Sequence, residues 1–274
     1  MSLMAFTPGP YACSKNSVVA TVVFVHAHPD DEAIFTAGTM CLLSSAGHRV
    51  VLVVATGGEL GIPHQDAAGP GHLAVVRRDE TAAAAALLGV DRTEFLGYHD
   101  SGMAGDAAND APGSLWSTDA AEVADRLAVI LDEERAAALV TYDETGIYGH
   151  PDHLQVHRAC ALAAAQANTQ TVYQATVDRE YLHFVETHLV EQAILAGDLG
   201  MVRSHIGVPS VMITTAVDVT SELDRKRAAM AAHASQIPET TSAFQLGLEQ
   251  FAAVYGWEWF VRTGPPGPID ELAS

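Results

Sequence analysis

The sequence predicts an α/β protein: a Rossmann-like, mostly parallel β-sheet with helices on both faces, plus a smaller C-terminal extension. Apolar runs alternate with helical segments along most of the 274 residues, which is the pattern of βαβ units. Residues 18–27 are almost continuously apolar, as expected of a central parallel strand covered on both faces. Polar clusters directly follow the apolar runs, and ligands of such sheets bind beyond the carboxyl ends of the strands.

The predicted elements follow one another in a regular order. Strands are predicted at residues 18–27, 49–56, 93–96, 138–142, 171–175 and 210–215. Helices are predicted at residues 31–46, 73–88, 119–134, 151–167, 221–234 and 244–255. Gly89 is suited to end the second of these helices, and Pro151 is suited to begin the fourth. Right-handed crossovers between the parallel strands then give the Rossmann-like arrangement.

A single domain is expected over residues 18–263, and its weakest pattern lies between residues 176 and 209. Residues 1–17 are expected to form an N-terminal arm. Residues 264–274 contain three prolines and are expected to form a loose tail. Apolar residues make up 49% of the chain, which is enough for the core of one large domain.

The charge balance excludes one class of partner. The chain has 34 acidic and 14 basic residues, and its net charge is −20. A surface this acidic repels phosphate backbones, so we expect no nucleic-acid partner. The balance fits a protein that handles small neutral or polyhydroxylated substrates. Homo-oligomer formation is compatible with the sequence, which carries no specific signal for it.

Cysteine usage and hydropathy indicate a cytoplasmic protein. Cys13, Cys41 and Cys160 are far apart and form no CxxC pair, so we expect free thiols in a reducing compartment. No apolar run reaches the roughly 18–20 residues that a membrane span needs. Residues 1–17 do not have the pattern of a signal peptide.

Two histidine–aspartate clusters carry the candidate chemistry. His28 and Asp31 are three residues apart where the first strand gives way to a helix, so their side chains share a face. His150 and His153 form a second pair with this spacing at the start of another helix. Imidazole nitrogens and carboxylate oxygens are normal zinc ligands, and a catalytic zinc takes three of them and leaves one position for water. By spacing alone, either histidine of the second pair can complete the site.

Each cluster also has a structural interpretation. An aspartate before a helix is usually an N-cap, and a single buried histidine is usually only hydrogen-bonded. The occurrence of both clusters in one chain, each after an apolar strand, favours a metal site. The neighbouring carboxylates of Asp30 and Asp31 then divide the work, because one binds the metal and the other can take a proton from water.

At these positions the sequence resembles the LmbE-like, or PIG-L, family of zinc-dependent N-deacetylases. The resemblance rests on Ala-His-Pro-Asp-Asp-Glu at residues 27–32 and Gly-His-Pro-Asp-His at residues 149–153. The family includes N-acetylglucosaminyl-phosphatidylinositol deacetylases, the mycothiol-pathway deacetylase and mycothiol conjugate amidase. Further segments that match are Arg77 to Glu80, Leu88-Gly89, residues 100–103 and residues 233–236.

The resemblance implies a role for each residue of the two main motifs. His28, Asp31 and His153 would bind the metal, and Asp30 would be the general base. The metal implied is zinc, although His/His/Asp ligation also admits iron(II).

The same resemblance implies roles for five further residues. His150 would stabilise the oxyanion or protonate the leaving amine. Asp152 would orient His150 and favour its protonated form. Tyr148 would also reach the oxyanion. Arg77 and Asp100 would hold hydroxyl groups of the sugar.

The leading functional prediction is a metal-dependent hydrolase that removes an N-acyl group, which the resemblance implies is acetyl, from an amino sugar such as an N-acetylglucosamine conjugate. One alternative is an amidase that cleaves a larger mycothiol-like or glycosylated metabolite conjugate. A second alternative is a non-catalytic binding module stabilised by its metal. Asp30 discriminates against the second, because a structural site needs four protein ligands and no spare base.

Overall fold

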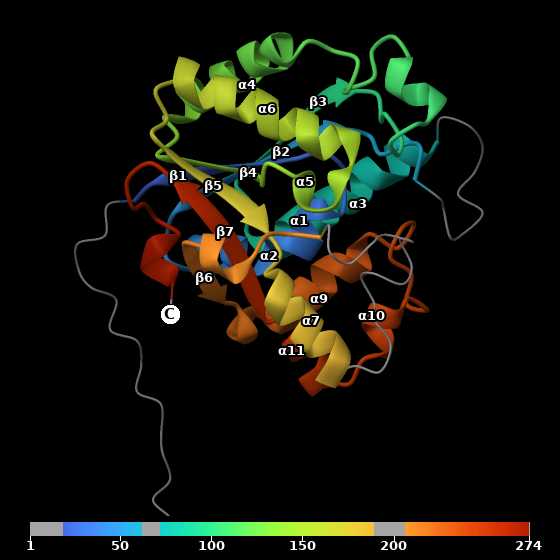
Figure 1. Cartoon of the computed structure of the whole chain (residues 1–274), viewed down its shortest axis with the longest axis vertical. Coiled ribbons are helices and arrows are strands. Elements are labelled where there is room, and N and C mark those ends of the chain that lie inside the picture. Colours follow the sequence, from blue (N-terminus) through green and yellow to red (C-terminus); the bar gives the residue numbers. More distant parts are fainter. Residues whose placement is uncertain (1–18, 62–71, 189–205, 274) are drawn as a thin grey trace, which may run out of the picture.

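The computed structural model describes residues 19–61, 72–188 and 206–273, and these form one seven-stranded sheet (Figure 1). The strand order is β3-β2-β1-β4-β5-β7-β6. The strands are β1 (Thr21–His26), β2 (Arg49–Thr56), β3 (Arg92–Tyr98), β4 (Ala138–Tyr142), β5 (Thr171–Thr176), β6 (Thr215–Asp218) and β7 (Trp257–Thr263). The first five run parallel, whereas β7 is antiparallel to β5 and β6. The predicted α/β fold class is therefore confirmed.

Helices cover both faces of the sheet, as the pattern predicted (Figure 1). One face packs against α2 (Ala37–Ser45), α3 (Leu73–Leu88), α9 (Leu223–Ala232) and α11 (Leu248–Tyr255). The other face packs against α4 (Ala120–Glu134) and α6 (Pro151–Gln166). Side chains alternate along a strand, so Val22 and Phe24 of β1 enter the first core, and Val23 and Val25 enter the second.

The helix predicted at residues 31–46 is two helices. It divides at Thr36 into α1 (Asp31–Phe35) and α2. The buried carboxylate of Glu258 accepts hydrogen bonds from the backbone N–H groups of Gly38 and Thr39, at 2.9 and 2.8 Å. Glu258 therefore satisfies the start of a new helix, and it does so from β7, far along the chain.

The C-terminal part differs more from the prediction. The strand predicted at residues 210–215 is wrong, because a short 3-10 helix (Ser210–Met212) stands there and β6 begins only at its end. β7 was not predicted. The helix predicted at residues 244–255 is divided into α10 (Ser242–Gln245) and α11. Within the stretch that carried no clear pattern, the structure describes α7 (Arg179–His188).

The prediction of a loose tail is wrong for the described residues 264–273. Ile269 is fully buried in the core, beneath β5 and β6. The carboxylate of Asp270 accepts hydrogen bonds from Tyr173 and Thr215, at 2.6 and 2.8 Å, and pairs with Arg262 at 2.7 Å. The prolines indicated an irregular backbone, which is correct, but an irregular segment still packs when its side chains find partners.

Several expectations concern other regions. The N-terminal arm at residues 1–17 and Cys13 lie outside the described residues. Cys41 and Cys160 are buried free thiols. Among the described helices, none combines the length and apolarity that a bilayer crossing requires.

The buried tail predicts a measurable contribution to stability. Ile269→Ala should lower the free energy of unfolding by about 2–5 kcal/mol, because it leaves a cavity in a closed core. Chemical denaturation would measure it. Val211→Ala is the control, since Val211 is 91% exposed and its truncation should change stability by no more than about 0.5 kcal/mol. Equal small effects for both variants would restore the loose tail.

Candidate metal and active site

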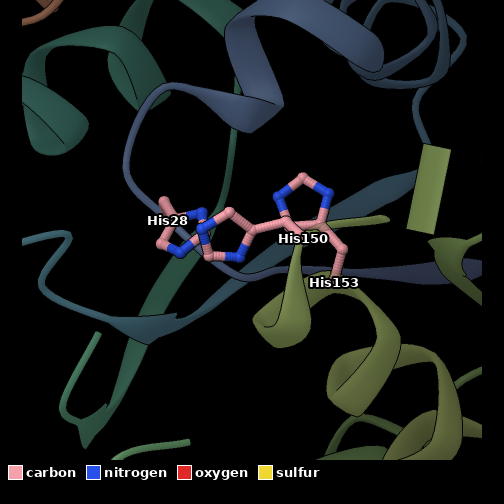
Figure 2. A group of neighbouring side chains, drawn as sticks. All are labelled: His28, His150 and His153. Atoms are coloured by element: carbon pink, nitrogen blue, oxygen red, sulfur yellow. The ribbon is translucent and has the colours of Figure 1, made fainter. Parts of the chain in front are cut away.

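Two segments far apart in the sequence meet at the carboxyl edge of the sheet. β1 and β4 are adjacent and parallel, so the residues that follow each strand emerge side by side. His28 and Asp31 follow β1. The segment after β4 contains α5 (Gly146–Gly149) and then the start of α6, which carries His150 and His153. Figure 2 shows the three imidazoles of this cluster grouped together.

The predicted ligand set converges on one carboxylate oxygen. Oδ2 of Asp31 lies 3.4 Å from Nδ1 of His28 and 3.4 Å from Nε2 of His153. Ligand atoms about 2.0–2.2 Å from a tetrahedral zinc are about 3.3–3.6 Å from one another, so these spacings fit a shared ion. Although burial opposes it, His153 and His28 hold the pKa of Asp31 well below its usual range, so this carboxylate is ionised.

The cluster offers other donors as well. Ligating atoms of His28, His150 and His153 all lie within 4.8 Å of one another. The same holds for the set of His28, Asp100 and Asp152. All of these side chains are buried. His28 belongs to every set, and the identity of its co-ligands remains a prediction.

Hydrogen-bond partners beyond the predicted ligand set orient two of the histidines. Nδ1 of His153 lies 3.2 Å from the carbonyl oxygen of Gly146, and Nε2 of His28 lies 3.1 Å from Oδ2 of Asp152. If these nitrogens carry the protons, each histidine keeps its other nitrogen free to bind a cation. Metal-binding histidines usually have such outer partners, which fix the tautomer and the ring orientation.

The predicted role of Asp152 toward His150 stays a prediction. Among the described residues, its carboxylate forms no hydrogen bond with His150; Oδ2 lies 3.1 Å from Nε2 of His28 and accepts a hydrogen bond from the backbone N–H of Ser101, at 3.0 Å. The backbone N–H of Asp152, not its side chain, donates to Nδ1 of His150, at 3.2 Å.

The surroundings of His150 oppose the protonated form expected of it. Burial, together with the neighbouring His28 and His153, lowers the pKa of His150 to about 3, against the opposing charges of Asp152 and Asp31. Because Nδ1 accepts a hydrogen bond, the neutral ring carries its proton on Nε2. His150 is thus arranged as a neutral hydrogen-bond donor.

Tyr142, which the sequence analysis did not single out, supports the cluster. It ends β4, and its hydroxyl donates to Oδ2 of Asp31 at 2.6 Å and accepts from the backbone N–H of Ala27 at 2.7 Å. Its ring stacks on that of His153, with centroids 4.0 Å apart and planes 6° apart. In the sequence, Tyr142 is only the last residue of an apolar strand, and its one signal was the polar cluster that begins six residues later.

Asp30 is placed apart from the ligand carboxylate beside it. Its side chain is 18% exposed, and Oδ2 lies 3.0 Å from Nη2 of Arg77. Its backbone has a φ of +106°, a region that residues other than glycine rarely adopt. Burial raises the pKa of Asp30 to about 6, with Arg77 opposing and Asp31 adding to the rise. A carboxylate with this pKa is suited to accept and return a proton near neutral pH.

The described hydrogen bonds of Arg77 all go to other groups of the protein. It is 3% exposed, and its guanidinium donates to the carbonyl oxygens of Gly58 and Pro29 as well as to Asp30. The contact that the structure describes is therefore the one that holds Asp30. The predicted role of Arg77 toward a sugar hydroxyl stays a prediction.

Asp100 and Tyr148 lie at the rim of the cluster. Oδ1 of Asp100 is 3.8 Å from Nε2 of His28 and accepts a hydrogen bond from the backbone N–H of Gly102, at 2.8 Å. The hydroxyl of Tyr148 is 3.5 Å from Nε2 of His153. Burial, together with the charge of Asp31, raises the pKa of Tyr148 well above its usual value, so its hydroxyl remains a donor.

The turn that carries Tyr148 is held in an unusual conformation. Ile147 has φ +63° and ψ −52°, which is rare for a β-branched residue. The backbone N–H of Ile147 donates to the carboxylate of Asp143 at 3.0 Å, and the carbonyl oxygen of Ile147 accepts from the N–H of Gly207 at 2.7 Å. These contacts hold the turn between Tyr148 and the carbonyl of Gly146, which lies against His153.

A His/Asp cluster of metal-ligand type and a separate carboxylate, both at the carboxyl edge of a Rossmann-like sheet, fit the class of metal-dependent amide hydrolases. Residues 23–164 match the family described as GlcNAc-PI de-N-acetylase, PIG-L. The chain belongs to this family, which confirms the resemblance found in its sequence.

Curated relatives match over most of the chain. A protein of Salinispora arenicola named 1D-myo-inositol 2-acetamido-2-deoxy-alpha-D-glucopyranoside deacetylase is 37% identical over 265 residues, which cover 90% of this chain and 86% of the relative. A protein of the same name from Acidothermus cellulolyticus is 38% identical over 266 residues, with 89% of each chain covered.

Solved structures share the fold. The N,N'-diacetylchitobiose deacetylase from Pyrococcus horikoshii aligns with a TM-score of 0.58 and 25% identity, covering 89% of this chain and 84% of that one. The 4-carboxy-2-hydroxymuconate hydratase from Pseudomonas putida KT2440 aligns with a TM-score of 0.57 and 20% identity, covering 91% and 98%. The same fold thus carries a different reaction, so the chemistry must be argued from the site.

The ligand set predicts which variants lose metal. His28→Ala, Asp31→Ala and His153→Ala should each bind far less metal than the wild-type chain in elemental analysis, because each removes one of three ligands. His150→Ala should keep its metal. His48→Ala is a control, since His48 is buried but contacts the backbone of Ala20 instead of the cluster. Metal loss in His150→Ala with retention in Asp31→Ala would replace the predicted set by the three histidines.

The hydrogen bond of Tyr142 to Asp31 predicts a smaller effect on metal binding. Tyr142→Phe keeps the ring stacked on His153 but removes the hydrogen bond to Asp31, so zinc affinity should fall about 10–100-fold in competition with a chelator. The matched control is Tyr173→Phe, which removes a hydrogen bond to Asp270 away from the cluster. Unchanged zinc affinity in Tyr142→Phe would show that Asp31 needs no such support.

Proposed function

We propose that this protein is a zinc-dependent N-deacetylase that removes the acetyl group from an N-acetylglucosamine unit joined to a cyclitol such as myo-inositol. The relatives at 37% and 38% identity are named for such a substrate and cover most of the chain. The P. horikoshii enzyme is named for another N-acetylglucosamine compound. Iron(II) also suits two histidines and one carboxylate, so it is the alternative metal.

The observation that carries the proposal is the position of Asp30. It stands beside a cluster of metal-ligand type, keeps 18% of its side chain exposed, and is paired with Arg77 instead of with the cluster. A metal site that served only stability would have no use for an adjacent, partly exposed carboxylate of raised pKa.

The residues divide the chemistry of amide hydrolysis between them. His28, Asp31 and His153 would hold a divalent cation, which would lower the pKa of a water and polarise the amide carbonyl. Asp30 would accept the proton of the water whose oxygen attacks the carbonyl carbon. Nε2–H of His150 and the hydroxyl of Tyr148 donate hydrogen bonds to the oxygen that becomes negative.

The second half of the reaction needs a proton on the leaving nitrogen. Asp30 is protonated after the first step, and its raised pKa allows it to give that proton up again. It returns the proton to the nitrogen as the C–N bond breaks, and acetate and the free amine result. The neutral state of His150 disfavours it as the proton source.

The remaining predicted roles concern the sugar. Asp100 is 6% exposed at the rim of the cluster, where its carboxylate can accept a hydrogen bond from a hydroxyl group. Arg77 keeps its predicted role of holding a sugar hydroxyl, next to its contacts with Asp30 and with the carbonyl oxygens of Gly58 and Pro29. A neutral polyhydroxylated substrate also agrees with a chain of net charge −20, which would repel an anion.

A deacetylation screen tests the proposal. The zinc-loaded and iron(II)-loaded chains should release acetate from N-acetylglucosaminyl-inositol and more slowly from free N-acetylglucosamine. Release of a larger acyl or amine fragment from conjugates, without acetate, would favour the amidase alternative. Metal binding without turnover of any acylated amine would favour the non-catalytic module.

The variant Asp30→Ala tests the role of Asp30 as the base in the same screen. It should retain its metal and lose about 10²–10⁴-fold in kcat, because the proton of the attacking water has no acceptor. Asp132→Ala is the control, since Asp132 is exposed on α4 and should behave as the wild type. Near-normal turnover in Asp30→Ala would reject Asp30 as the base.

A further inference from the structure

The end of α9 reaches the site from the C-terminal part of the chain. His233 directly follows α9, is fully buried, and places Nε2 2.5 Å from Oε1 of Glu32. Glu32 is fully buried as well, and its other oxygen, Oε2, accepts a hydrogen bond from the backbone N–H of Asp30, at 3.1 Å. Two contacts thus connect the proposed base to a histidine 201 residues away from Glu32.

The backbone of Asp30 needs such support. Its φ of +106° and ψ of −27° lie in a region that costs a residue with a side chain energy and persists only where the surroundings impose it. Its carbonyl oxygen accepts hydrogen bonds from the N–H groups of Ala33 and Ile34, at 3.0 and 3.2 Å. The contact with Glu32 holds the N–H on the other side of the residue, so both backbone polar groups are fixed.

The turn at residues 233–236 makes a second contact with the same region. The N–H and the hydroxyl of Ser235 donate to the two carboxylate oxygens of Glu80, at 2.8 and 2.7 Å. Glu80 lies on α3 one turn after Arg77, which donates to the carboxylate of Asp30. The turn at residues 233–236 therefore supports two parts of Asp30. It supports the backbone of Asp30 through Glu32, and it supports the side chain of Asp30 through α3.

The contacts of His233 itself are few. Among the described residues, Nδ1 of His233 is buried and has no hydrogen-bond partner. The ring is thus oriented by Glu32 alone, and a histidine kept for packing would be expected to satisfy both nitrogens. His233 is therefore arranged to donate one hydrogen bond, to Glu32.

We propose that His233 is a positioning residue for the catalytic base: by donating to Glu32, it fixes the carboxylate that holds the left-handed backbone of Asp30. The inference rests on the proposed function, which makes Asp30 the base. It adds a residue from outside the two metal motifs to the machinery. Because misplacing a reacting group by about 1 Å can cost about 100-fold in rate, loss of this contact should affect turnover more than binding.

Three substitutions test the proposal in the full zinc-loaded chain. His233→Ala should keep its zinc, lose about 10–100-fold in kcat and keep KM within about 2-fold. His233→Gln should recover most of kcat, because its amide can still donate to Glu32. His233→Asn has the same amide on a shorter side chain and should behave as His233→Ala. If the alanine variant does not fold, the Gln and Asn pair still decides the question.

Testing His233→Ala in a second parent chain, Asp30→Ala, distinguishes a positioning role from general disruption of the structure. In the Asp30→Ala chain, adding His233→Ala should cause no further loss of residual turnover, because the residue on which His233 acts has no side chain left to position. His48→Ala, another buried histidine, should leave kcat unchanged in either background. An equal loss on adding His233→Ala to both backgrounds, or loss of zinc, would overturn the proposal.

Crystal structures of the zinc-loaded variants give a readout that does not depend on the substrate. Asp30 should leave the positive-φ region in His233→Ala and His233→Asn, and remain there in His233→Gln. An unmoved Asp30 in the alanine variant would overturn the proposal even if turnover fell. If the wild-type chain deacetylates nothing, the proposed function fails, and the position of Asp30 still decides whether His233 and Glu32 hold it.

Discussion

The parallel pairing of β1 with β4 is the constraint on which the site depends. The two strands are neighbours in the middle of the sheet, and their inward residues are almost completely buried on both faces. Their carboxyl ends therefore lie at one fixed spacing, which brings His28 within 3.1 Å of Asp152 although 124 residues separate them. The chemistry is assembled by strand pairing, and the rigidity of the sheet becomes the rigidity of the ligand geometry.

Buried charges are costly unless they are paired, and this protein pairs several of them around the candidate metal cluster. Asp31 is held by Tyr142 and by the backbone of His28, and Glu32 is held by His233. Each contact offsets part of the desolvation cost. It also fixes an oxygen before any substrate arrives. Preorganised dipoles of this kind need little rearrangement during reaction, which is a large part of how enzymes lower barriers.

The sequence predicted the parts of this arrangement that are local. His28 and Asp31, and likewise His153, stand in short motifs directly after apolar strands, so their spacing and their place at the sheet edge could be inferred together. The fold class followed from the alternation of apolar runs and helical segments.

Long-range partners were not accessible in this way. Tyr142 is indistinguishable from a core residue until its hydroxyl is seen on Asp31, and Glu32 resembles an ordinary acidic residue at a helix start. The division of the first helix depends on Glu258, 220 residues after Gly38. The hydrogen bond between the carboxylate of Asp152 and His28 was missed for the same reason, because nearness in sequence to His150 does not determine which side chain that carboxylate meets.

The left-handed turn at Ile147 sets a limit on how this enzyme can be improved. Its backbone conformation favours glycine, yet its side chain is 1% exposed in the core beneath α6. Glycine would relieve the torsion and leave a void, whereas a residue as large as isoleucine keeps both the packing and the strain. Evolution or engineering toward greater heat tolerance must therefore look elsewhere in the chain, because at Ile147 relief of the backbone and filling of the core require different side chains.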